Sequence, residues 1–507
     1  MCRALVLCAL TISLLAGCSV KRLSRTLTAP DRAASLDRTA PLLKAHLRDG
    51  RVLVLGEWSA DPVARTVSGR GDALDVNRSI IAQGSFTVPL DSVALFETNV
   101  VQTSSSVAAL TVVTVASLAL TAYCIANPKA CFGSCPTFYI SDGTHLQLQA
   151  EGFSSSILPS LEATDVDALY RVAEPKGELE VRMRNEALET HVVRHVELLA
   201  VPRAMDERVF ATAAGEFLRG RLTAPPSRCA GPEGDCRAAL LAFDGVERLS
   251  LADSTDLAAR ERIELEFSDV EDGPLGLVLA RRQTLLTTYL YYQALAYMGR
   301  SAGHWLATLE RGGGDLPMRT DGIGRALGGI EVFVRSEDGT WLRAGEDTET
   351  GPLAADVRVL PLPRVAGKPL HVRLQMARGL WRLDWVALAR LSGSAAPIRL
   401  RPVVVERAGP NAAGTVARDG ALTTQPGDEY IFRFRLPAAG RPHELFLETR
   451  GYYLEWMRDA WLAEENPQRA AMMLAQPAEA LRVLAPEFKA QEAGMERTFW
   501  GSRYAHP

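Results

Sequence analysis

Alternating apolar and polar residues recur along most of this chain. Clear examples are Leu179-Glu-Val-Arg-Met183, Ile263-Glu-Leu-Glu-Phe267 and Trp381-Arg-Leu-Asp-Trp385. A period of two predicts strands with one buried and one polar face, as in sheets that a partner covers on one side. Stretches with a fully apolar or helical pattern interrupt these strands. We therefore expect a mainly β fold class with helical insertions (α+β).

The strand-like segments form three groups. A small N-terminal β domain is expected over residues 41–100, where short strand patterns such as Arg51–Leu55 are separated by Gly and Asp turns. A β-sandwich-like module is expected over residues 128–270, which begin with a hairpin signal at Ser141-Asp-Gly143. A second β module is expected over residues 312–450.

The segments between and after these groups predict helices. Residues 101–127 predict an apolar helix, and residues 451–507 predict a helical tail of short amphipathic pieces. Residues 271–311 are apolar on nearly all sides, so they predict a buried helical segment. Tyrosines cluster in this segment and could form a platform for a ligand, although packing in the core is the favoured interpretation.

The run from Val107 to Ala126 contains no charged residue. Its length and hydropathy suit a transmembrane helix. However, Thr and Ser recur throughout it, and a span across the inner membrane would place a nearby cysteine pair in the reducing cytoplasm. A buried or surface-lying helical hairpin is therefore favoured, and insertion in a membrane stays open.

The first residues have the features of an export signal. Arg3 precedes the uncharged run Ala4–Ala16, which is too short to span a bilayer as a helix. Leu15-Ala16-Gly17-Cys18 resembles the lipobox of bacterial lipoproteins. That resemblance implies cleavage after a signal peptide over residues 1–17, acylation of Cys18 and a tether over residues 18–40. An ordinary signal peptide with an accidental cysteine, or a short buried helix, is the alternative.

Ser19 is not the aspartate that resembles a signal for retention in the inner membrane. The resemblance to lipoproteins therefore implies a place in the bacterial cell envelope, anchored by lipid in the outer membrane and facing the periplasm.

Export implies an oxidising compartment, so cysteines are candidates for disulfides. Cys229 and Cys236 close a polar, turn-rich loop, and Cys131 and Cys135 form a second local pair. Cys124 is the odd thiol. Zinc would require a different spacing with histidines between the pairs, and no metal site is expected.

Composition excludes several classes of protein. The chain has 507 residues, of which 47% are hydrophobic and 23% charged, and these fractions exclude a disordered or fibrous chain. The formal net charge of −4 excludes a generally basic nucleic-acid binder. Several globular domains are expected from the length.

Gly299-Arg-Ser301-Ala-Gly303 matches the nucleophile-elbow pattern of serine hydrolases. An elbow requires a strand before the serine and a helix after it, within alternating β and α elements. The run before Ser301 is more helical than a strand, so a helix ending at Gly299 is the favoured interpretation. Catalysis by Ser301 is kept as an alternative.

Three weaker patterns offer other chemistry. His191 and His195 lie four residues apart but in a strand-like context without the acidic partner of metalloproteases. The glycine-rich runs Gly312–Asp315 and Gly322–Gly329 lack the Gly-Lys-Ser/Thr ending of a phosphate-binding loop, so linkers are the favoured interpretation. Asp384 between Trp381 and Trp385 could indicate stacking of a sugar, although alternation alone places aromatic residues there.

Cys135-Pro-Thr-Phe-Tyr-Ile-Ser-Asp-Gly143 resembles a segment, Cys-Pro-x-x-Tyr-x-x-Asp-Gly, in a group of exported bacterial proteins with β-rich modules. The resemblance covers mainly residues 130–300. It implies export and β structure, but no activity and no site residue.

These patterns together favour a membrane-anchored envelope lipoprotein with a binding or structural role rather than an enzyme. The expected partners are the membrane, through the lipid anchor, and an envelope protein; no nucleic acid and no cofactor are expected. The alternatives are a serine hydrolase using Ser301 and a component of a membrane assembly with a transmembrane helix at 107–126.

Overall fold

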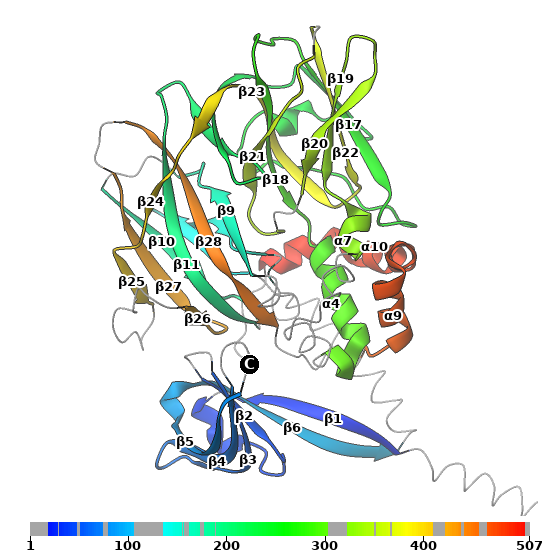
Figure 1. Cartoon of the computed structure of the whole chain (residues 1–507). Helices are drawn as coiled ribbons and strands as arrows, with labels where there is room; N and C mark the ends of the chain where they lie inside the picture. Colours follow the sequence, from blue (N-terminus) through cyan, green and yellow to red (C-terminus); the bar gives the residue numbers. More distant parts are fainter. Residues whose placement is uncertain are drawn as a thin grey trace, which may run out of the picture. The chain divides into compact units, whose positions relative to one another are not determined.

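The computed structural model describes most of the chain, and two compact units contain the described residues. Unit 1 contains the described residues between 19 and 105 together with 464 and 465, and unit 2 those between 135 and 455 and between 466 and 501. The predicted class is confirmed at the level of a mainly β chain with several sheets and a few helices (Figure 1). The described residues are 19–28, 30–47, 51–74, 80–105, 135–154, 156, 162–172, 177–187, 189–302, 322–348, 351–365, 368–408, 421–437, 441–455 and 464–501.

Several predicted features lie outside the described residues. They are the signal peptide 1–17 with Cys18, the uncharged run from Val107 to Ala126, Cys124 and Cys131.

Unit 1 is a six-stranded antiparallel sheet in the order β1-β6-β2-β3-β4-β5. Alternate side chains of its strands meet in one apolar core, in which Leu43, Leu55, Val67 and Phe96 are fully buried. Its elements are β1 (Ser19–Thr28), η1 (Pro30–Ser35), β2 (Leu43–Leu47), β3 (Val52–Asp61), β4 (Thr66–Leu74), β5 (Ile80–Pro89), η2 (Leu90–Ser92) and β6 (Val93–Ser105).

β1 and β6 form a long two-stranded ribbon (Figure 1). The register pairs Thr28 with Phe96 at one end and Ser19 with Ser105 at the other. The structure thus differs from the predicted tether over residues 18–40, because β1 and η1 occupy most of it. Along β6, β2 pairs with residues 93–98 only. β1 pairs with β6 on its other side and supplies hydrogen-bond partners along residues 96–105, which would otherwise present an open edge.

Unit 2 contains a sandwich of two sheets. Apolar residues from both sheets share one core, for example Phe138 and Phe432 from one sheet and Leu198 and Leu447 from the other. The first sheet has the order β25 (Val404–Arg407), β27 (Glu429–Arg435), β10 (Glu178–Arg184), β7 (Thr137–Ser141) and β8 (Leu146–Glu151). The second has the order β24 (Ile398–Leu400), β11 (Glu189–Pro202), β28 (His443–Glu455) and β9 (Ala163–Ala168), and β26 (Leu422–Thr424) also pairs with β11.

Two further sheets complete the β structure of unit 2. In one of them β13 pairs with both β12 and β23, so five of its strands close on themselves. This sheet has the order β13 (Phe217–Ala224), β12 (Arg208–Ala211), β21 (Asp356–Pro361), β18 (Leu275–Gln283), β23 (Trp381–Ala395) and β16 (Arg248–Leu249). The other has the order β15 (Gly234–Asp235), β14 (Arg228–Gly231), β17 (Arg260–Phe267), β22 (Leu370–Ala377), β19 (Ile330–Arg335) and β20 (Trp341–Asp347).

These pairings differ from the predicted succession of modules over 128–270 and 312–450. β10 pairs with β27 and β11 pairs with β28, so each sheet of the sandwich combines strands from both segments. The predicted helical segment 271–311 begins with a strand, β18, because this central strand is buried on both faces and therefore shows no alternation.

The helices of unit 2 gather at one place (Figure 1). α9 contacts α10, which follows it directly, and also α4 and α7, which lie far from it in sequence. In the described part of the chain, no helix combines the length and apolar character needed to cross a membrane. The helical elements are η4 (Arg237–Leu240), α4 (Leu286–Met298), η5 (Gly299–Ser301), α7 (Gly322–Leu327), α9 (Pro467–Ala475) and α10 (Pro477–Gly501).

Candidate functional site

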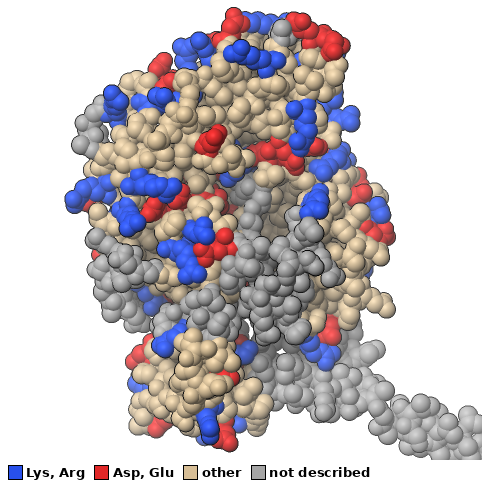
Figure 2. Space-filling model, in the orientation of Figure 1, with Lys and Arg blue, Asp and Glu red and all other residues tan. Residues whose placement is uncertain are grey.

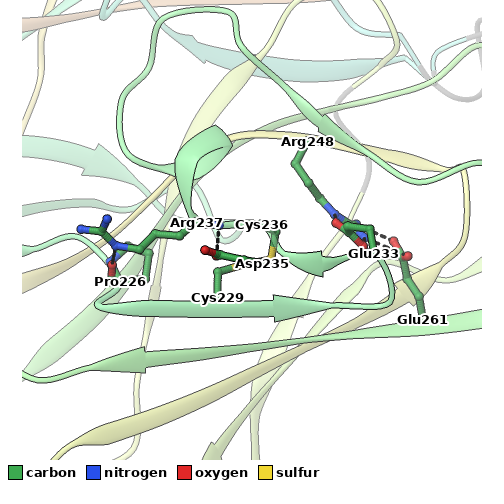
Figure 3. Close-up of a disulfide and its surroundings, with 8 residues drawn as sticks. All are labelled: Pro226, Cys229, Glu233, Asp235, Cys236, Arg237, Arg248 and Glu261. Carbon is green, nitrogen blue, oxygen red and sulfur yellow. Dashed lines mark hydrogen bonds and ion pairs between the residues drawn. A yellow bond between two sulfur atoms is a disulfide. The ribbon is translucent and has the colours of Figure 1, made fainter.

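Cys229 and Cys236 form a disulfide that closes the loop between β14 and η4 (Figure 3). The Arg237 side chain donates to the carbonyl of Pro226, and its backbone N–H donates to Asp235. This loop is fixed at both ends.

A buried arginine holds the tip of the same loop (Figure 3). Arg248 binds Glu233 with two N–H groups, at 2.6 and 2.8 Å, and also binds the buried Glu261 at 2.6 Å. Burial alone would lower the pKa of Arg248, but the hydrogen bonds that it donates to Glu233 and Glu261 raise it above its usual value. The loop is therefore a rigid part of the fold.

Ser301 lies at the end of a helix. It belongs to η5, directly after α4, and its Oγ donates to the carbonyl of Met298 at 2.7 Å. A nucleophile elbow requires a strand before the serine. The element before Ser301 is instead α4, which ends as the sequence pattern at Gly299 indicated.

His191 and His195 do not converge. The register of β11 shifts between Val193 and His195, and this bulge breaks the alternation that would put both rings on one face. His191 is fully buried, with Nε2 3.1 Å from Glu189 Oε2, whereas His195 is half-buried beside Glu448. Within the described residues no three His, Cys, Asp or Glu side chains are grouped so that they could hold a metal.

Asp384 has a structural environment. It accepts hydrogen bonds from the backbone N–H groups of Asp244 and Gly245 and from Arg171, at 2.7–3.2 Å. Burial raises the pKa of Asp384 above its usual value. The partners of this carboxyl group are thus an arginine and a turn that it anchors.

A cavity of about 730 Å³ lies within unit 2. This volume is in the range of small-molecule sites. Three buried side chains of its lining come from different strands of unit 2: Glu189 from β11, Gln283 from β18 and Trp381 from β23. The full lining comprises Cys135, Glu151, Ser154, Glu189, Arg260, Gln283, Thr287, Thr288, Tyr291, Tyr292, Gly324, Arg325, Gly328, Gly329, Glu331, Glu346, Thr348, Gly351, Pro352, Trp381 and Tyr453.

Tyrosines and carboxylates meet on one side of this cavity. The Tyr292 hydroxyl donates to Glu455 and also lies 3.3 Å from Glu189 Oε1. Glu189 contacts His191 through its other oxygen. Because one hydroxyl carries one proton, the Tyr292 hydroxyl donates to only one of the two carboxylates at a time.

Tyr453 is a neighbouring donor in the cavity lining. Its hydroxyl donates to the Ser154 carbonyl at 3.0 Å. Burial, followed by the nearby Cys135 and Glu189, raises the pKa of Tyr453 well above its usual value. The phenol therefore stays protonated at neutral pH. Cys135 is itself buried, with its thiol 3.6 Å from the Ser154 carbonyl.

Another part of the cavity wall is a segment around Gly351. Glu151 accepts from the Leu353 N–H at 2.7 Å, and Gly351 has a positive φ of 75°. A Cβ atom at Gly351 would lie 2.6 Å from Glu151 Oε2, and the positive φ also favours glycine there. The next residue, Pro352, accepts from Arg282 at 2.8 Å.

A buried ion network supports this wall from β18. The guanidinium of Arg281 is fully buried and donates to Asp347, which lies between two cavity-lining residues, and to Asp356 at 3.1 Å. Burial alone would raise the pKa of Asp356, but the charges of Arg358 and Arg281 and the N–H of Ala168 lower it.

Asp167 on β9 behaves in the opposite way. Burial, followed by the charges of Asp165 and Asp356, raises the pKa of Asp167 well above its usual value. Its Oδ2 is buried without a hydrogen-bond partner. Asp167 is therefore a carboxyl group that burial and its neighbours favour in the neutral form.

Sequence reasoning reached only part of this lining. It considered Asp384 with Trp381 and Trp385 for stacking of a sugar and the tyrosines of the segment 271–311 for a ligand platform, but favoured a structural interpretation of both. Of these residues, Trp381, Tyr291 and Tyr292 line the cavity. Glu151, Glu189 and Gly351 carry no local signal of their own, because strands distant in sequence bring them together. Of the predicted cysteines, Cys135 lines the cavity, and its expected partner Cys131 lies outside the described residues.

Charges of both signs cover the surface. On the face drawn in Figure 2, Lys and Arg side chains lie among Asp and Glu side chains. Many are paired across strands, as Arg399 is with Glu448 at 3.0 Å. The described part of this face therefore presents no continuous positive surface of the kind that nucleic acids require.

The fold and the cavity define a β-rich chain of two units, with a cavity of small-molecule size in unit 2. No protein-family model and no curated protein matches it. A solved GH31 alpha-xylosidase from Xanthomonas citri aligns at 8% identity with a TM-score of 0.15. The alignment covers 85% of this chain and 38% of the xylosidase chain. This similarity is too low to assign a fold or a function.

Proposed function

We propose that this protein is a bacterial envelope lipoprotein, anchored through Cys18, whose unit 2 binds a small molecule in the cavity. The observation that carries the binding role is the cavity itself, because its volume and its buried polar groups are those of a ligand site. The lipobox resemblance supports the anchor and the location at the outer membrane, facing the periplasm.

The ribbon of unit 1 supports attachment to a membrane. Ser19, which follows the lipobox cysteine, pairs with Ser105, which lies just before the uncharged run from Val107. Since consecutive Cα atoms are about 3.8 Å apart, the lipobox cysteine and the uncharged run are both attached near the same end of the ribbon. A membrane at this end would receive both of them.

The disulfide of unit 2 bears on how the run at 107–126 meets the membrane. If the run crossed the inner membrane, unit 2 would lie in the cytoplasm, where a Cys229–Cys236 disulfide would be reduced. A run that enters from one side and returns, or lies on the surface, keeps both units in the oxidising compartment. We therefore prefer a lipid anchor without a span to a membrane assembly with a transmembrane helix.

Mass spectrometry of the mature N-terminus tests the anchor. We expect a first residue Cys18 that carries acyl chains, and we expect Cys18→Ala to release the protein from membranes on carbonate extraction. An unacylated mature end would contradict the anchor. A Cys18→Ala protein that stays in the membrane after extraction would favour the span at 107–126 instead.

Co-purification tests the binding role. The full-length protein is isolated in detergent from its own envelope and analysed by native mass spectrometry. We expect a bound small molecule that is absent from Thr288→Phe, because Thr288 lines the cavity and the larger ring fills part of it. Thr66→Phe, which adds the same bulk to a half-buried position of unit 1, is the control. A wild-type protein without bound ligand, even after incubation with an envelope extract, would contradict the binding role.

A serine hydrolase remains the alternative function. The hydrogen bond from Ser301 to the Met298 carbonyl does not favour it, because that bond occupies the hydroxyl proton at a helix end. A fluorophosphonate probe decides between the two. Labelling that Ser301→Ala abolishes would support the hydrolase, whereas an unlabelled wild-type protein excludes it.

A further inference from the structure

The indole of Trp381 points to the chemistry of the ligand. Trp381 is the first residue of β23, is 1% exposed and lines the cavity. Its Nε1–H is buried without a hydrogen-bond partner. An indole nitrogen only donates, and buried donors in native proteins are nearly always paired. A ligand that fills this cavity can supply the missing acceptor.

The carboxylates of the cavity exclude one class of ligand. Glu151 and Glu189 are each 1% exposed, so their charges are poorly screened by water. An anion placed between them would be repelled at short range. The arginines of the lining, Arg260 and Arg325, are exposed and therefore offset this repulsion only weakly.

The same indole disfavours a second class. An ammonium ion has donors but no acceptor, so it would suit the carboxylates and leave Trp381 Nε1–H unpaired. The site thus requires a ligand that donates to Glu151 or Glu189 and also accepts from Trp381. A hydroxyl group does both, since it has one proton and two lone pairs.

Other groups of the lining also suit hydroxyls. The Gln283 side-chain oxygen accepts from Thr287 at 3.0 Å, and its amide end has two N–H donors. Tyr291 and Tyr292 pack edge to face with ring centres 5.4 Å apart and provide flat apolar surfaces. Flat rings beside fixed polar groups match a compound with both C–H faces and hydroxyl edges.

We propose that the cavity binds a neutral, hydroxyl-rich ligand of carbohydrate type, with Trp381 Nε1–H donating to one of its oxygens. This inference rests on the proposed binding function and names the class of its ligand.

Fluorine NMR of the full-length protein labelled with 5-fluorotryptophan tests the proposal. The resonance missing from Trp381→Phe identifies Trp381. The probes are three neutral trisaccharides (chitotriose, cellotriose and maltotriose), together with n-butylammonium, which has N–H donors and no acceptor, and inorganic phosphate. We expect at least one trisaccharide to shift the Trp381 resonance, and n-butylammonium and phosphate to leave it in place.

Affinities of matched variants complete the test. Trp381→Phe keeps an aromatic ring and loses the N–H, so we expect about a tenfold weaker affinity, equivalent to about 1.4 kcal/mol. Trp385→Phe on the same strand lies outside the cavity lining and should bind as wild type does. Thr288→Phe should also weaken binding, which covers the case that Trp381→Phe fails to fold.

Three results would overturn the proposal: no shift with any trisaccharide, a shift with n-butylammonium or phosphate alone, or unchanged sugar affinity in Trp381→Phe. A co-purified ligand without hydroxyl groups would also overturn it while leaving the proposed binding function intact.

Discussion

Replacing Arg281 by methionine probes the ion network under the cavity wall. The wild-type guanidinium is fully buried and binds the carboxylates of Asp347 and Asp356 together with the Asp356 carbonyl. Methionine fills much of the volume but removes the charge and these hydrogen bonds. Two carboxylates, 4% and 1% exposed, then lose a cation that compensates them. Breaking a buried pair in this way costs about 3–5 kcal/mol.

Urea unfolding followed by near-ultraviolet circular dichroism measures this loss. Tm falls by about 2–4 °C for each kcal/mol of unfolding free energy that is lost, so Arg281→Met should lower Tm by roughly 10 °C. Arg221→Met is the matched control, because Arg221 and Glu271 form an exposed pair, for which about 0–1 kcal/mol is expected.

The pH dependence separates lost charge from lost packing. Arg281 helps to lower the pKa of Asp356, and a lowered pKa contributes stability above the unfolded value that is lost as pH falls. Without Arg281 the folded-state pKa of Asp356 rises, so the difference between variant and wild type should be constant near neutral pH and shrink as the pH falls through the ordinary aspartate range, at about pH 4. An equal loss in Arg281→Met and Arg221→Met, or a deficit that does not change with pH, would refute the electrostatic argument.

Three further changes test other parts of the fold. Replacing both Cys229 and Cys236 by serine should lower the free energy of unfolding by about 2–3 kcal/mol, as expected for a loop this short, and urea unfolding of the non-reduced proteins measures the loss. Because the pKa of Asp167 is raised, the wild-type protein should lose stability as the pH rises from the ordinary aspartate pKa to this raised pKa. Asp167→Asn should remove this loss and be at least as stable at neutral pH. Urea midpoints over a pH series measure the effect, and a variant that followed the wild-type curve would contradict it. Phe96→Ala in the core of unit 1 should cost about 3–5 kcal/mol by pulse proteolysis, against less than about 0.5 kcal/mol for Val63→Ala, whose side chain is 95% exposed; equal losses would contradict the assignment of the core.

Local pattern was enough to predict many strands. Leu179–Met183, Ile263–Phe267 and Tyr430–Phe434 alternate in sequence and lie within β10, β17 and β27, each with a regular succession of buried and less buried residues. The reason is that each of these strands packs against an apolar core on one side only. Its residues therefore alternate between apolar and polar with a period of two.

The same reasoning failed where a strand has protein on both sides. Residues 277–283 are buried without interruption, so β18 looks in sequence like the start of the helix that follows it. Length is the only local signal that separates the two, since a buried run of four to eight residues suits a strand as well as part of a helix. The Arg281-Arg282 pair in this run looks like an interruption of the apolar pattern, yet both arginines are buried because carboxylates from distant parts of the chain bind them.

The cavity shows why the site was harder to predict than the strands. Trp381 reaches it because β23 pairs with β18, which places Trp381 opposite Gln283. Glu189 reaches it because β11 pairs with β28, more than 240 residues further along the chain, which brings Tyr453 beside His191. Each pairing is antiparallel and is fixed by the register of whole strands, so no single residue or short motif encodes it. The groups that would bind a ligand therefore derive their common position from the interleaving of the two halves of unit 2. A change that shifts the register of β23 on β18 would move Trp381 away from Gln283 without altering any residue of the cavity lining.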